Sequence, residues 1–133
     1  MNDLHADDYL DSTDPEALKA AAHRFDFILD TVSAAHDVNA LISTLNVDGT
    51  LCFVGAPPTP HAVGAFSLIG GRRTVGGSLI GGVKETQDML DFCGRHNIVC
   101  DIELINASSI NEAYERTMRS DVKYRFVIDT ATL

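Results

Sequence analysis

The residue types that most readily bind metals or attack substrates are sparse in this chain. Cys93 and His96 stand three residues apart on a predicted helix, with Cys100 shortly after them. A structural zinc ion needs four nitrogen or sulfur ligands in recognisable pairs, and no second pair is visible. We therefore predict no metal site and no catalytic residue. We expect Cys93 and Cys52 to be small buried apolar residues, and His96 to be exposed near a helix end.

The remaining histidines are scattered along the sequence. They are His5, His23, His36 and His61, and none stands in an HExxH motif or a serine-hydrolase setting. The three cysteines make an odd and sparse set, which argues against a disulfide framework and is typical of a reducing compartment.

The glycines, which allow another group to approach the backbone closely, are concentrated in one region of the sequence. Seven of the ten glycines lie between Gly64 and Gly82. From residue 74 onward, paired glycines flank a short apolar run, and a strong helical pattern follows it. Glycine lets another group approach closely because it has no Cβ. Open α/β sheets bind ligands where a strand ends in a glycine turn before a helix, so we expect a ligand crevice here.

Three predicted strands end in segments that suit such a crevice. These segments are Thr31 with Val32, Val54 with Gly55 and Ala56, and Ser78 with Leu79 and Ile80. Together they would form an apolar wall whose backbone N–H and C=O groups are available to a flat polar ring. The alternative is that all three are ordinary junctions between strand and loop, and periodicity alone does not decide between the two.

Short β-rich runs alternate with helical patterns along the chain. Strands are predicted at residues 8–10, 25–32, 50–54, 74–80, 101–105 and 124–128, and helices at 15–23, 36–45, 65–69, 84–96 and 109–120. We expect residues 25–32 to be a buried strand, residues 48–49 a turn, and the proline-rich residues 55–60 a loop. Strands separated by about ten to fifteen helical residues imply right-handed crossovers. The predicted fold is therefore α/β, with a mostly parallel sheet and helices on both faces.

Composition sets further limits on function. The chain has 133 residues, of which 45% are hydrophobic, and this fits one domain over residues 1–133. Its 19 acidic and 10 basic residues give a net charge of −9, which repels phosphate backbones and anionic membranes. No apolar run approaches the roughly 20 residues of a membrane span, and the acidic start lacks the features of a secretory signal. We expect a cytoplasmic protein with no nucleic-acid or membrane partner.

Four collinear motifs carry a resemblance to a known enzyme family. They are DTVS at residues 30–33, VGAP at 54–57, GSLIGG with KETQ at 77–87, and DVKYRFVID at 121–129. From about Ala6 to Leu133 the chain resembles the C-terminal part of the cinnamyl alcohol dehydrogenase family, and bacterial aldehyde reductases of that family look most similar. These enzymes are zinc-dependent and NADP(H)-linked, and they interconvert primary alcohols and aldehydes. The resemblance implies a partial Rossmann-like domain without its first βαβ unit, followed by a segment that returns to the catalytic domain.

The resemblance also implies roles for particular residues. It places at the nicotinamide end of the cofactor Thr31, Val32, Val54, Gly55, Ala56, Ser78, Leu79 and Ile80. It places on the wall of the alcohol or aldehyde pocket Phe66, Ile69, Leu79 and Ile80. Arg125 matches a position near the pyrophosphate, and its alternative is a solvated arginine at a strand end. The strand from Thr74 to Ile80 matches the edge that pairs with a second subunit, which implies a homodimer.

Three parts of a complete family member have no counterpart in the sequence. They are the Cys, His and Glu residues around the catalytic zinc, the four cysteines of a structural zinc, and the glycine-rich turn that holds the pyrophosphate. Without them we expect weak or no NADP(H) binding and no activity from these residues alone, because hydride transfer to an aldehyde needs a Lewis acid. The missing first strands would also leave residues 25–32 as an open edge, which predicts either an oligomer or a sheet rearranged from the parent order.

Two hypotheses follow from the sequence. In the first, the chain is the cofactor-domain portion of an NADP(H)-dependent alcohol dehydrogenase and works only with a separate zinc-binding catalytic half. In the second, it is a non-catalytic dimerisation or interaction module derived from that fold.

Overall fold

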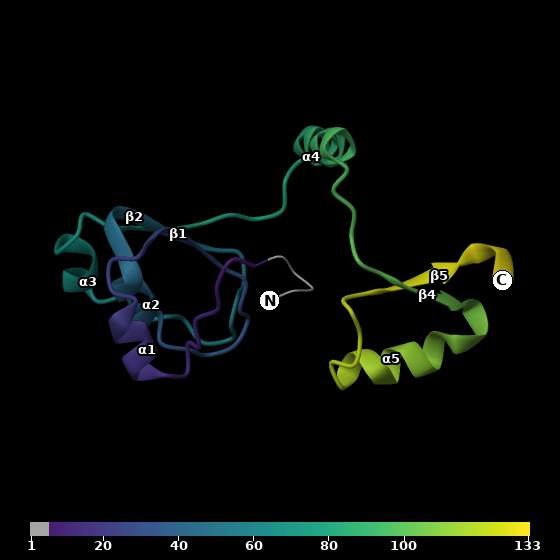
Figure 1. The fold of residues 1–133 in the computed structure, drawn as a ribbon, viewed down its shortest axis with the longest axis horizontal. Coiled ribbons are helices and arrows are strands. Elements are labelled where there is room, and N and C mark those ends of the chain that lie inside the picture. The colour runs from purple at the N-terminus through teal and green to yellow at the C-terminus, as the bar shows by residue number, and fades with distance from the viewer. Residues whose placement is uncertain (1–5) are drawn as a thin grey trace. The chain divides into compact units, whose positions relative to one another are not determined.

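The computed structural model describes residues 6–133, which divide into two compact units (Figure 1). Unit 1 takes the described residues up to Ile80, and unit 2 is Gly81–Leu133. The prediction of one domain over residues 1–133 stays a prediction, since a domain can itself contain several cooperative units. Among the described residues, no helix combines the length and apolar character that crossing a membrane requires.

Unit 1 is built on a parallel three-stranded sheet. Its elements are α1 (Pro15–Ala20), β1 (Phe25–Asp30), α2 (Val38–Thr44), β2 (Leu45–Phe53), α3 (Ala65–Ile69) and β3 (Thr74–Gly77). The strand order is β1-β2-β3, and both pairings are parallel. The predicted α/β class with a mostly parallel sheet is therefore confirmed, as is the short helix predicted at residues 65–69.

The core of unit 1 lies where α2 packs against the sheet. Ile28 of β1, Leu51 of β2 and Val75 of β3 occupy matching positions across the three strands. Val38 and Ile42 of α2 pack with these side chains, and Ile42 and Leu51 are fully buried. Burying one such side chain stabilises the fold by about 1.5–3 kcal/mol. This packing fixes the start of α2 relative to the ends of the strands.

β1 is an edge strand whose apolar side chains are only partly covered. Phe27 and Leu29 are 58% and 54% exposed, and they alternate with the packed Ile28 because successive side chains point to opposite faces. The prediction of a buried strand over residues 25–32 is wrong in this respect, and the strand ends at Asp30. The prediction of an open edge is confirmed, since within the described residues β1 pairs only with β2.

The strand predicted at residues 8–10 is also wrong, because these residues form no strand. The carboxylate of Asp8 instead accepts a hydrogen bond from the Tyr9 N–H at 2.8 Å and pairs with the Arg24 guanidinium. Aspartate side chains that bond to neighbouring backbone groups compete with strand pairing. A strand of three residues would form too few hydrogen bonds with a neighbouring strand to outweigh these local contacts of Asp8.

The turn predicted at residues 48–49 lies inside β2 as a local irregularity. β2 already begins at Leu45, the residue predicted to end the preceding helix. Asp48 has a left-handed φ of 63°, and the register between β1 and β2 shifts between Leu45 and Thr50, the stretch that contains Asp48. Arg72 binds the Asp48 carboxylate through two nitrogens, at 2.8 and 2.6 Å, and this contact lowers the pKa of Asp48. The turn signal was correct locally, but the strand continues through it.

Unit 2 combines two short parallel strands with two helices. Its elements are α4 (Val83–His96), β4 (Glu103–Asn106), η1 (Ala107–Ser109), α5 (Ile110–Met118), β5 (Phe126–Asp129) and η2 (Thr130–Thr132). The helices and strands predicted here are confirmed, with ends displaced by no more than two residues. Ala113 is the only buried residue of residues 81–133.

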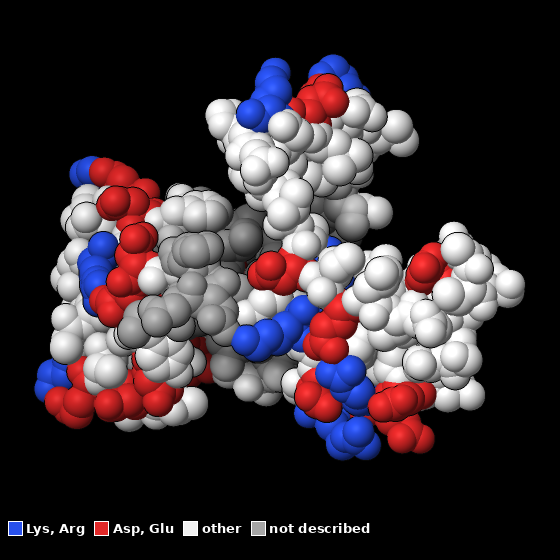
Figure 2. Space-filling model, turned by 45° about the vertical axis from the view of Figure 1, so that its right-hand side comes forward, with Lys and Arg blue, Asp and Glu red and all other residues white. Residues whose placement is uncertain are grey.

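Figure 2 shows acidic side chains gathered on the lower part of unit 1. Helix α1 lies at the same height in Figure 1. Asp11, Asp14 and Glu16 lie just before or at the start of this helix, and all three are exposed. Asp14 also caps α1 by accepting hydrogen bonds from two N–H groups of its first turn. That nucleic acid is not a partner stays a prediction, which rests on the net negative charge.

Candidate functional site

The carboxyl ends of β1, β2 and β3 lie along one edge of the sheet, as parallel pairing requires. The N–H groups of Val54 and Gly55 both donate to the Asp30 carbonyl, at 2.9 and 3.1 Å. Ser78 donates its N–H to the Phe53 carbonyl at 3.0 Å. The hydrogen-bond ladder therefore continues past the last residues of β2 and β3, and the three following segments begin side by side.

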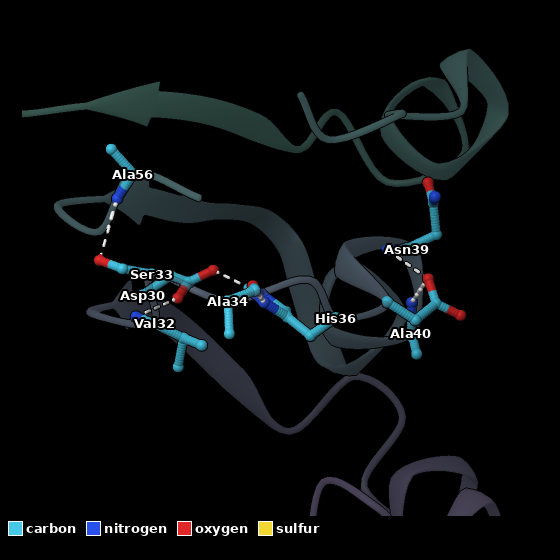
Figure 3. Close-up of polar contacts among 9 residues, drawn as sticks. Asp30, Val32, Ser33, Ala34, His36, Asn39, Ala40 and Ala56 are labelled. Atoms are coloured by element: carbon cyan, nitrogen blue, oxygen red, sulfur yellow. Dashed lines mark hydrogen bonds and ion pairs between the residues drawn. The ribbon is translucent and has the colours of Figure 1, made fainter. Parts of the chain in front are cut away.

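Gly55 allows the segment after β1 to pass directly against the end of β2. A Cβ at position 55 would lie 2.6 Å from the carbonyl oxygen of Val32 and 2.8 Å from the carbonyl carbon of Thr31. Any side chain there would push the two segments apart. The Ser33 hydroxyl accepts a hydrogen bond from the Ala56 N–H at 3.3 Å and joins the same segments (Figure 3).

Asp30 is a buried carboxylate that organises the end of β1. It is 4% exposed. Its Oδ1 accepts a hydrogen bond from the Val32 N–H at 2.9 Å, and its Oδ2 lies 2.8 Å from Nε2 of His36 (Figure 3). A carboxylate is stable inside a protein only when it is paired and hydrogen-bonded, and Asp30 meets both conditions.

His36 precedes α2, whose first turn is capped by Asp37. The Asp37 carboxylate accepts from two N–H groups of that turn, at 3.0 and 3.2 Å (Figure 3). The Nδ1 atom of His36 lies 2.9 Å from the Ala34 carbonyl oxygen. This hydrogen bond raises the pKa of His36 above its ordinary value; Asp30 and Asp37 raise it further, whereas partial burial opposes the shift.

The loop between β2 and α3 brings His61 against His36. The two rings meet edge to face with centroids 4.7 Å apart, and His61 also stacks on Phe53 at 5.1 Å. Nε2 of His61 is buried and has no hydrogen-bond partner among the described residues. Asp30, His36 and His61 form a cluster in which one ligand atom of each lies within 4.8 Å of the others.

This histidine cluster was not predicted, because its members look scattered in the sequence. A signal was nevertheless present. His36 comes six residues after the last residue of β1, and His61 comes eight residues after the last residue of β2. Residues at similar intervals beyond neighbouring parallel strands fall at the same edge of a sheet. Cys52 and Cys93 are half-buried rather than buried, and His96 is exposed as predicted.

The structure brings most of the predicted cofactor-contacting residues to this edge. Those in the joined strand ends are Thr31, Val32, Val54, Gly55, Ala56 and Ser78. Arg125 lies in unit 2, where it lines a cavity of about 350 Å³ together with Tyr124 and Phe126. Its predicted position near a pyrophosphate stays a prediction.

The residues predicted to wall a substrate pocket are open to solvent. Leu79 and Ile80 follow β3 and are each 90% exposed, while Phe66 and Ile69 on α3 are 88% and 68% exposed. Their role as a pocket wall stays a prediction.

A groove of about 600 Å³ runs between α1 and α2. Leu18 lines it from α1, Leu41 lines it from α2, and Val32 and His36 reach it from the segment after β1. No residue from the ends of β2 or β3 contributes to its lining. The groove and the three strand ends therefore share Val32.

Comparisons with known proteins place these features in a family context. Residues 1–95 match the model of a family described as zinc-binding dehydrogenase. The aldehyde reductase YahK of Escherichia coli is 53% identical over 131 residues, which cover 98% of this chain and 38% of the reductase.

Two solved structures share both fold and sequence with the chain. A cinnamyl alcohol dehydrogenase from Sorghum bicolor matches with a TM-score of 0.87 and 44% identity, over 97% of this chain and 36% of that protein. A cinnamyl alcohol dehydrogenase from Helicobacter pylori, complexed with NADP(H), matches with a TM-score of 0.71 and 39% identity, over 90% and 34%. The chain thus spans little more than a third of the length of these relatives.

Proposed function

This chain belongs to the zinc-binding dehydrogenase family, and we propose that it forms the nicotinamide side of the cofactor site in an NADP(H)-dependent alcohol dehydrogenase. The observation that carries the proposal is the joining of three parallel strand ends at one sheet edge. Ligands of open α/β sheets bind beyond the carboxyl ends of the strands. The relatives include an aldehyde reductase and a dehydrogenase complexed with NADP(H), which supports interconversion of primary alcohols and aldehydes.

The strand ends suit a flat, partly apolar ring. Val32 and Val54 are exposed there, whereas the buried Asp30 carboxylate is occupied by Val32 N–H and His36. An anionic cofactor would therefore meet no unpaired carboxylate from Asp30. Bound nicotinamide would supply the hydride donor or acceptor, and the backbone around Gly55 would position its ring. The segment around Leu79 would cover the ring from β3.

The relatives are about three times as long as this chain. We propose that zinc and the pyrophosphate are bound by the parts of such an enzyme that this chain does not match. These 133 residues contain none of the family's cysteine-containing zinc sets and no glycine-rich turn ahead of β1. Polarising an aldehyde carbonyl for hydride transfer takes a Lewis acid. The 133 residues alone are therefore expected to bind NADPH weakly and to leave aldehydes unreduced.

Weak binding at a defined place is measurable by NMR. Titration of the ¹⁵N-labelled chain with NADPH should shift the amide signals of residues 31–33, 54–56 and 78–80. Gly55→Ala should abolish these shifts because its Cβ would collide with the Val32 carbonyl. Gly94→Ala is the matched control, since a Cβ there meets no atom within 4 Å. Unchanged strand-end signals at millimolar NADPH would refute the proposed site.

We also propose that β3 forms a dimer interface by pairing with a second copy of the chain. β3 is an edge strand of the described sheet and pairs only with β2. Because the Ser78 N–H points to β2, the N–H groups of Gly76 and Ser78 face β2 and that of Gly77 faces the open edge. Gly77→Pro should therefore convert a dimer into a monomer without breaking the β2 ladder. Light scattering that shows a 14.4 kDa monomer for the unaltered chain would exclude this interface.

The second candidate function, a non-catalytic interaction module, is favoured by the open β1 edge and its exposed Phe27 and Leu29. Exposed apolar edges readily pair with another chain. The NADPH titration separates the two functions, because an interaction module need not retain a nicotinamide site.

A further inference from the structure

Three potential metal ligands converge next to the strand ends, from three separate segments. Asp30 closes β1, His36 precedes α2, and His61 lies in the loop between β2 and α3. One ligand atom from each residue lies within 4.8 Å of the other two. Asp30 is almost fully buried, and both histidines are partly buried. The cluster is thus part of the folded interior of unit 1 rather than a group of surface side chains.

The ring of His36 is oriented in the way that metal-binding histidines are. A carbonyl oxygen can only accept, so Nδ1 of His36 carries the hydrogen that it donates to Ala34 at 2.9 Å. Nε2 faces the carboxylate of Asp30 at 2.8 Å. A carboxylate also only accepts, so Nε2 carries a hydrogen in this contact and must lose it before it binds a metal ion. Metal-ligating histidines usually donate the N–H of their other nitrogen to a carbonyl or carboxylate, which fixes ring orientation. The Ala34 carbonyl is placed to do this.

His61 supplies an observation that the rest of the fold does not explain. Its Nε2 is buried without a hydrogen-bond partner among the described residues. Leaving a buried polar atom unsatisfied costs about 1–3 kcal/mol. The ring is nevertheless held in place by stacking on Phe53 and by its edge contact with His36. A ligand for this nitrogen would remove the cost.

We propose that Asp30, His36 and His61 bind a divalent transition-metal ion of the zinc class. Two imidazoles and one carboxylate form a ligand set that zinc accepts, with a fourth position left for water or another ligand. Zinc bonds of about 2.0–2.1 Å in tetrahedral geometry place ligand atoms about 3.3 Å apart. The ligand atoms, which lie within 4.8 Å of one another, would have to move closer together when the ion binds. This site contains no cysteine, unlike the zinc sets that the family resemblance implies.

The ion would join the loop after β2 to the end of β1 and the start of α2. It would thereby fix the loop that follows Gly55 and hold the three segments around Val32. An ion that binds only the folded state stabilises that state by mass action. This inference does not depend on the proposed cofactor site, because the ligands and the readouts below involve neither NADPH nor an aldehyde.

The test uses the full 133-residue chain after removal of metals with a chelator. Zn²⁺ alone is titrated by calorimetry, and Co²⁺ alone by visible absorption, which reports ligand type and geometry. We expect one ion per chain and a histidine and oxygen ligand spectrum without thiolate bands. His61→Ala and Asp30→Asn should each weaken zinc binding about tenfold or more, since even outer-shell changes cost about that much. His96→Gln removes an exposed histidine of α4 and should change nothing.

A second readout keeps the test decisive if a variant loses its fold. In the unaltered chain, stoichiometric Zn²⁺ should shift the ring nitrogen signals of His36 and His61 in ¹⁵N NMR and leave those of His96 in place. The proposal is overturned if the chain binds no zinc at micromolar concentration. It is also overturned if zinc binds while the His61 ring signals stay unchanged, because the ion would then occupy another place such as the thiols of Cys93 and Cys100.

Discussion

Units 1 and 2 are both α/β and both have parallel strands, yet different interactions hold them together. In unit 1, Ile42, Leu45 and Leu51 are fully buried between α2 and the sheet. In unit 2, Ala113 is the only buried residue of residues 81–133. Apolar burial thus stabilises the unit that carries the candidate site, whereas unit 2 depends more on polar contacts.

The polar contacts of unit 2 centre on Arg116 of α5. Its guanidinium pairs with Glu103 of β4 at 2.8 Å and with Asp121 at 3.1 Å, and it lies over the Phe126 ring of β5 at 4.8 Å. One side chain therefore connects the helix to both strands. Leu104 of β4, by contrast, is 65% exposed. Because their stabilising contacts differ, the two units should respond to different perturbations.

The largest expected effect is on the core of unit 1. Ile42→Ala should lower the free energy of unfolding by about 2–5 kcal/mol, because it removes a fully buried side chain and leaves a cavity. Leu104→Ala in unit 2 is the matched control and should cost less than about 0.5 kcal/mol, since that side chain is exposed. Urea unfolding followed by circular dichroism measures both. Equal losses would remove the contrast between the units.

A smaller effect is expected from the polar network of unit 2. Arg116→Gln should speed amide hydrogen exchange in β4 and β5 while leaving β1 and β2 unchanged, because it breaks two ion pairs and the contact with Phe126. Lys84→Gln removes a single exposed pair within α4 and should change exchange in neither sheet. Unchanged exchange in β4 and β5 of the Arg116 variant would show that unit 2 is held by something else.

The smallest effect is the dependence of unit 2 on pH. The Lys123 backbone N–H and then Arg116 hold the pKa of Glu103 below its ordinary value of 4.5. A lowered carboxyl pKa contributes stability above the ordinary value, and this contribution is lost as pH falls through the lowered one. Protection of β4 and β5 amides should therefore decline below about pH 4.5. In Glu103→Gln this decline should be smaller, and an identical profile in that variant would contradict the assignment.

Local signals in the sequence predicted most elements, because they depend on neighbouring residues. Asp14 and Pro15 correctly marked the start of α1, and the apolar run at residues 65–69 correctly marked α3. Features that depend on distant residues were harder to predict. Periodicity could not show that Phe27 would be exposed, since exposure depends on what packs against that face. Nor could it show that His36 and His61 meet, because β1–β2 pairing brings them together.

The site was predictable in outline for the same reason. Parallel strands predict that Val32, Val54 and Ser78 share an edge, and the hydrogen bonds between the strand ends are consistent with this. The sequence emphasised the paired glycines of β3, but the closest backbone approach is at Gly55; a Cβ at Gly76 would meet nothing within 4 Å. The close contact at Gly55 exists because the segment of Thr31 and Val32 passes against it, and that segment comes from another part of the chain.

The most direct test of the proposed function is a reconstitution assay. The part of the Escherichia coli aldehyde reductase that lies outside the matched segment is joined to this chain, and NADPH oxidation with an aldehyde is followed by absorbance. We predict aldehyde reduction by the zinc-loaded fusion, none by the 133 residues alone, and loss of the fusion's activity on Gly55→Ala. A folded, zinc-loaded fusion that neither binds NADPH nor reduces an aldehyde would contradict the proposal that these strand ends form the nicotinamide side of a dehydrogenase.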